Sequence, residues 1–236
     1  TSAGTVIKRG SSSVTVNSYN YRLSGTLIIE EGEIVQNNYH FWGNRSTSSK
    51  VIIKDGATLR QEFTYSEMGG ARIIAEGSGV GGQGAIIVNK ANTSDIPYLV
   101  LSNDTYVVFN TTATIFGSNS DYRNPALLEM NGYTLTIGGT AATVTMKNVN
   151  VTGGGTIKFE SGTARTLKLT GTTDLDTTKI STDADLTLTT GTWANGIAVG
   201  ADATLTLAPG EDATILTVSG AITGEGNVSI GTAATA

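Results

Sequence analysis

The sequence predicts an all-β protein, a parallel β-helix, and three observations support this fold class. A short phrase of two strands around a turn recurs along most of the chain, and it recurs about every 24 residues. No stretch has the 3.6-residue periodicity of an amphipathic helix. A repeat of this length indicates a solenoid, and a unit built only of strands excludes leucine-rich and helical repeats.

The clearest copy of the phrase is residues 127–139. Leu128 and Met130 flank Glu129, and the segment after the Asn131-Gly132 turn alternates apolar residues with threonine. Alternation with a period of two is typical of a strand with one buried face. We therefore predict that this phrase is one segment of a coil whose strands pair with the coils above and below.

Eight copies of the phrase set the predicted size of the solenoid. The middle residues of their first strands are at positions 28, 52, 73, 100, 129, 157, 180 and 198. Spacings of 18 to 29 residues are interpreted as loops of different length inserted between coils. Strands stack about 4.8 Å apart, so eight to ten coils would form a rod about 40–48 Å long.

We predict one domain over residues 1–236, with three zones. Residues 1–26 contain a hairpin-like pair of short apolar segments and are expected to cap the solenoid. Residues 27–133 hold most aromatic residues and the longer loops, whereas residues 134–236 are plainer and contain 26 Thr. A domain boundary near residues 133–140 is the alternative.

Composition excludes several classes of protein. Charged residues make up only 15%, the net charge is −5, and the chain has no basic patch, which argues against nucleic-acid binding. The chain contains no Cys, so disulfides and thiolate metal sites are impossible. No apolar run is long enough to span a bilayer, so no membrane insertion of this segment is expected. Because the chain lacks an initiator Met, we expect a processed form or a piece of a longer protein.

The repeats resemble a known family. Residues 128–139 look like the strand repeat of bacterial autotransporter passenger domains and related haemagglutinin-like secreted adhesins, and residues 199–208 resemble another version of it. The resemblance covers residues 27–230 as a degenerate pattern. It implies a right-handed parallel β-helix that is secreted from, or displayed on, a bacterial surface. It implies no single activity, because such passengers include adhesins, proteases and inert stalks.

A first candidate site is the aromatic cluster Tyr39, His40, Phe41 and Trp42, in the predicted loop between the first two coils. Exposed aromatic rings can stack on sugars at a low cost in conformational entropy, so the cluster is a candidate glycan platform. The alternative is that the loop folds over the solenoid and buries Phe41 and Trp42 as a small satellite core.

An alternative acidic site comprises Asp104, Asp121 and Arg123, with Glu129 close in sequence. Cleavage of polysaccharides requires paired carboxylates or a carboxylate cluster with a basic residue nearby. The simpler interpretation is a surface ion pair that closes the loop over residues 117–125. The segments typical of galacturonan hydrolases and the Gly-x-Ser-x-Gly elbow are absent.

Two other segments contain residue types that also occur in ligand-binding sites. The glycine-rich residues 79–84 lack the residues of a phosphate loop or a Ca²⁺ repeat, so a turn between coils is expected. Asp174, Asp176, Asp183 and Asp185 are expected to serve as turn residues, and weak Ca²⁺ binding is the alternative. No catalytic residue, metal site or cofactor is predicted.

These observations favour a non-enzymatic extracellular protein, structural or adhesive, that forms a rigid β-helix on a bacterial surface. The predicted partners are other copies of the chain, end to end or side by side, and a glycan or host-cell ligand held by the loops of the N-terminal half. The alternative function is a β-helix of pectate-lyase-like architecture that binds or cleaves polysaccharides.

Overall fold

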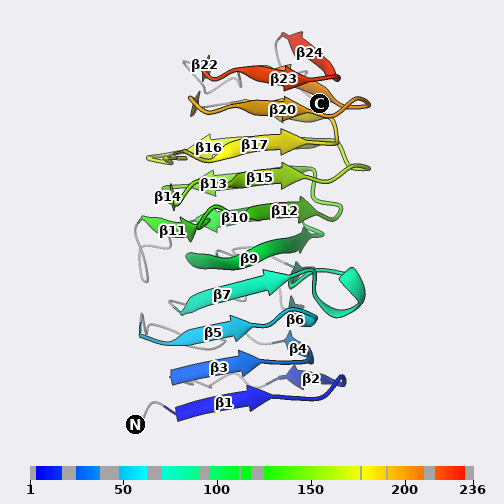
Figure 1. Ribbon diagram of the computed structural model, residues 1–236, viewed down its shortest axis with the longest axis vertical. Helices are drawn as coiled ribbons and strands as arrows, with labels where there is room; N and C mark the ends of the chain where they lie inside the picture. The colour runs from blue at the N-terminus through cyan, green and yellow to red at the C-terminus, as the bar shows by residue number, and fades with distance from the viewer. Residues whose placement is uncertain are drawn as a thin grey trace.

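The computed structural model is a parallel β-helix in which the chain climbs from one end of a rod to the other (Figure 1). It describes residues 4–17, 25–37, 48–62, 71–90, 96–111, 113–117, 125–175, 177–189, 191–209 and 216–231. Strands on the near side run one way, strands on the far side run back, and the ascent is right-handed (Figure 1). Ten strands pair one above another along the longest path, so the predicted fold class and eight to ten coils are confirmed.

We define the first face by the strands that begin the lower coils. They are β1 (Gly4–Lys8), β3 (Gly25–Ile29), β5 (Lys50–Ile53), β7 (Arg72–Gly77), the first part of β9 (Tyr98–Phe109), β11 (Ala126–Glu129) and β14 (Val149–Thr152).

The second face follows the first within each lower coil and continues to the top of the rod. Its strands are β2 (Ser13–Val16), β4 (Gly32–Gln36), β6 (Ala57–Gln61), β8 (Ile86–Val88), the second part of β9, β12 (Thr134–Gly138), β15 (Thr156–Phe159), β17 (Lys179–Thr182), β20 (Ile197–Val199) and β23 (Ile222–Gly224).

The third face occurs in the upper coils of the described chain. It comprises β10 (Ala113–Gly117), β13 (Thr143–Lys147), β16 (Arg165–Thr170), β18 (Leu186–Leu188), β21 (Thr204–Leu207) and β24 (Asn227–Ile230). A separate two-stranded sheet pairs β19 (Gly191–Trp193) with β22 (Leu216–Val218). The described helix is one short 3₁₀ turn, η1 (Val80–Gly82).

Columns of apolar side chains fill the interior because alternate residues of every strand point inward. The first-face column is in register from coil to coil and is buried; its members are Leu27, Val51, Ile73, Leu99, Leu128 and Val151. Burial of each such side chain stabilises the fold by about 1.5–3 kcal/mol. The buried apolar residues described between Leu27 and Leu205 form one continuous core cluster.

The corners between faces require glycine where backbones approach closely. Gly155 has φ +100°, and a Cβ there would collide with the carbonyl oxygen of Tyr133 in the coil below. Both the backbone angle and the space therefore exclude larger residues at this corner. Tight corners of this kind explain the high glycine content better than disorder does.

The structure differs from the sequence-based expectations in its details. β1 and β2 each pair in parallel with the strand above, so residues 4–17 form the lowest coil and not a hairpin. The Asn103-Asp104 segment lies within the long strand β9, which passes from the first face to the second, so β9 contributes to both faces of one coil. Residues 79–84 form a corner within one coil, between β7 and β8, and not a turn between coils.

The predicted series of eight copies also changes face. Its first five members lie on the first face, as in β3 and β11, but the last three lie in β15, β17 and β20 on the second face. The described offsets between paired residues range from 17 (Ile180 and Ile197) to 31 (Ala113 and Val144). The change of face cannot be recognised from the sequence, because loops of variable length keep the spacing between copies within the same range before and after it.

Candidate functional site

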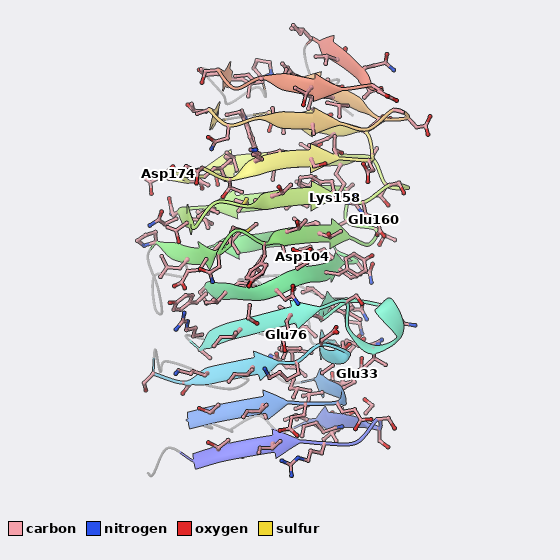
Figure 2. The ribbon with its side chains drawn as sticks, in the orientation of Figure 1. Glu33, Glu76, Asp104, Lys158, Glu160 and Asp174 are labelled. Atoms are coloured by element: carbon pink, nitrogen blue, oxygen red, sulfur yellow. The ribbon has the colours of Figure 1, made fainter. Side chains whose placement is uncertain are left out.

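Most of the predicted site residues lie outside the described part of the chain. This holds for Tyr39, His40, Phe41 and Trp42, and for Asp121 and Arg123. Asp104 is described and exposed, and its carboxylate accepts a hydrogen bond from the backbone N–H of Thr134 in the next coil at 2.8 Å. Asp104 therefore joins two coils at a corner (Figure 2).

The first face carries a polar group that we call the first-face cluster: Arg72, Tyr98 and Glu129. All three occupy outward positions, on β7, β9 and β11 in three successive coils. The Tyr98 hydroxyl donates to Glu129 Oε1 at 2.5 Å, and Arg72 Nη2 donates to Glu129 Oε2 at 3.0 Å. The Arg72 guanidinium also lies 5.3 Å from the centre of the Tyr98 ring.

The first-face cluster is accessible from solvent. The side chains of Arg72 and Glu129 are 34% and 27% exposed. A guanidinium, a phenol ring and a carboxylate held on a flat sheet offer donors, acceptors and a stacking surface together. This combination suits a hydroxyl-rich ligand better than an acid–base reaction, since Glu129 is already engaged by two donors.

A second polar group, the second-face cluster, consists of Tyr106, Glu160 and Arg165. The Tyr106 hydroxyl donates to Glu160 Oε2 at 2.6 Å, across the intervening coil. Gly138 lies beneath this bond, and a Cβ there would collide with the Tyr106 hydroxyl and the Glu160 carboxylate. Burial, followed by the hydrogen bond and negative charge of Glu160, raises the pKa of Tyr106 to about 12.

Arg165 fixes the corner beside Glu160 and is almost fully buried. Its Nη1 donates to the carbonyl oxygens of Glu160 and Thr163 at 2.9 and 3.1 Å, and its Nη2 donates to that of Gly139 at 2.6 Å. Burial lowers the pKa of Arg165, and the nearby Glu160 carboxylate partly offsets this. The guanidinium therefore acts as a structural clamp on backbone carbonyls.

Charge is distributed unevenly along the corners. At the lower corner between the first and second faces, Arg9 pairs with Glu30 at 2.7 Å and Lys54 with Glu76 at 3.2 Å. Glu33, labelled with Glu76 in Figure 2, pairs with Arg60 on the second face at 2.6 Å.

Fewer ion pairs form in the described upper coils, and acidic side chains outnumber basic ones there. Lys158 pairs with Asp183 at 2.7 Å, beside Glu160 (Figure 2). Asp185, expected as a turn residue, accepts a hydrogen bond from the backbone N–H of Thr204 at 2.8 Å. Asp202 and Glu225 lie exposed at the corresponding corner of the coils above.

Among the described residues, no group of three or more metal-ligating side chains comes together. Within the same ranges, no helix has the length and apolar character needed to cross a membrane.

Sequence reasoning named Glu129 and Asp104 but missed the partners that define the two clusters. The sequence did contain one signal for these residues. Tyr98, Tyr106 and Glu129 occupy alternate positions of their strands that point outward. An outward position alone does not predict which side chains meet. Tyr106 and Glu160 are 54 residues apart, and their contact depends on the lengths of two coils.

Comparison with known proteins adds no assignment: no protein-family model, curated protein or solved structure matches this chain.

Proposed function

We propose that this protein is a non-enzymatic structural or adhesive rod that acts outside the cell, at a bacterial surface. The supporting observation is the buried interior column from Leu27 to Val151 on the first face, together with the in-register column of Val144, Leu167 and Leu188 on the third face of the upper coils. A single core through all coils makes the rod stiff along its axis. The repeats' resemblance to secreted passenger domains favours an extracellular location.

The chemistry of the polar residues also favours this role over catalysis. Asp104, Glu129 and Glu160 each accept hydrogen bonds from groups of the chain itself. Carboxylates that cleave glycosidic bonds must instead face the substrate as a pair. These three carboxylates therefore join coils together.

The adhesive alternative within this proposal is supported by the first-face cluster. Arg72, Tyr98 and Glu129 form a partly exposed platform on a flat sheet, and such a platform suits a glycan. We therefore propose glycan contact at this cluster, in addition to the predicted aromatic loop at residues 39–42.

A bead assay tests both parts of the proposal. Beads coated with the chain are passed over surfaces that carry polysaccharides or cells, and the same polysaccharides are assayed for new reducing ends and unsaturated products. We expect beads to be retained without product formation, and Tyr98→Ala to weaken retention more than the matched variant Tyr106→Ala. Turnover that is lost in Glu129→Gln would contradict the non-enzymatic role.

A further inference from the structure

The third face of the upper coils carries a ladder of hydroxyl groups. Thr143, Thr166, Thr187, Thr206 and Ser229 stand in register on five successive coils and point outward. Their neighbours in the strands are the core residues of the column through Val144 and Leu167, which fixes this orientation. No hydrogen bond joins these five hydroxyls to another described residue.

The two margins of this face carry opposite charges. Asp185, Asp202 and Glu225 precede β18, β21 and β24 at the margin shared with the second face, and all three are exposed. Lys147 ends β13 at the other margin, and Lys168 lies outward in β16; both are exposed, and neither has a partner among the described residues.

We propose that this hydroxyl face is the contact surface for a second copy of the chain, with the two rods side by side and parallel. The inference rests on the proposed structural role of the rod and specifies the surface through which rods associate.

Self-complementarity favours a second copy as the partner. A two-fold axis parallel to the rod brings each side of the hydroxyl ladder opposite the other side of the partner's ladder, so Lys168 of each rod comes near Asp185 of the other. Hydroxyl groups both donate and accept hydrogen bonds, so a threonine ladder on this axis can bond to its own copy. The best-placed pair is Lys168 of one rod and Asp185 of the other, which differ by one coil.

The size of the face indicates a weak contact. Five strands about 4.8 Å apart and about 17 Å long cover roughly 400 Å² on each rod. A stable interface buries about 800 Å² on each partner. Association is therefore expected at high local concentration, as on a crowded surface, and it should weaken as salt screens the charged margins.

Charge reversal tests the orientation. Sedimentation of the full chain at high concentration should show dimers at low salt, and Lys168→Glu or Asp185→Lys alone should weaken the association on the order of tenfold. The double variant should restore it. Lys179→Glu makes the same change on the second face and should have no effect.

Cross-linking provides a measurement that does not depend on the charges. The chain has no Cys, so Thr187→Cys places one thiol at the centre of the ladder, and Ser181→Cys places one on the second face as a control. A short bismaleimide should link Thr187→Cys chains severalfold faster. Monomers at every salt concentration, or equal linking at both positions, would overturn the proposal. The bead assay uses immobilised single rods, so its result is independent of this one.

Discussion

The two polar clusters use the same three residue types to different ends. In the first-face cluster, Arg72 donates to the carboxylate of Glu129 and lies over the ring of Tyr98, and the group is partly exposed. In the second-face cluster, Arg165 is buried and donates to three backbone carbonyls, while Tyr106 alone bonds to the Glu160 carboxylate.

This difference distinguishes a cluster that can bind a ligand from a cluster that stabilises the fold. An exposed ion pair contributes little to stability because water solvates both charges, so its groups remain available to a ligand. A buried guanidinium that satisfies several carbonyls cannot be removed without leaving those groups unpaired. The first-face cluster is therefore the better candidate for binding, and the second-face cluster is part of the framework.

The largest expected effect comes from removing Arg165, and the comparison with Arg72 tests the distinction between the clusters. Arg165→Ala should lower the free energy of unfolding by about 3 kcal/mol, because three carbonyls lose a charged donor. Arg72→Ala should cost only about 0.5–1 kcal/mol, as expected for an exposed pair with a cation–π contact. Denaturant unfolding of both variants measures the comparison, with Arg165→Lys as the control that keeps the charge but loses the planar fork. Equal losses for the two alanine variants would remove the distinction between the clusters.

A smaller effect is expected when the space beneath the Tyr106–Glu160 bond is filled. Gly138→Ala should lower the free energy of unfolding by about 1–2 kcal/mol, because the new methyl group collides with both partners. Gly196→Ala is the matched control, since a Cβ there would lie 3.7 Å from the nearest atom, the carbonyl oxygen of Ala221. In a Tyr106→Ala background the cost of Gly138→Ala should fall, and an unchanged cost would contradict the assigned collision.

The smallest effect at neutral pH, and the sharpest test of the second-face cluster, is the titration of Tyr106. Its raised pKa means that folding favours the protonated phenol, so this stabilisation is complete below about pH 10 and is lost as the pH rises towards 12. The tyrosinate absorbance of the wild-type chain minus that of Tyr106→Phe should rise near pH 12. Glu160→Gln should move this step part of the way back, because burial is the larger cause. A step near pH 10 in the wild-type chain would show that Tyr106 is neither buried nor bonded to Glu160 in solution.

The sequence by itself determined that the chain forms strands with one buried face and that each coil has about 24 residues. Alternation such as that in residues 127–139 is local, so it could be recognised without knowing any partner, and both halves of this segment pair with the coils above and below as predicted. The period of about 24 residues followed from the same local signal.

Only the tertiary structure decided which face each strand occupies and which outward side chains meet. The number of residues per coil varies, so sequence spacing does not show which residues of neighbouring coils pair; the described offsets range from 17 to 31 residues. The contact of Tyr106 with Glu160 therefore depends on two coil lengths and on Gly138 between them. Alternation fixes whether a side chain points in or out, whereas the register between coils, set by the whole fold, fixes its neighbours.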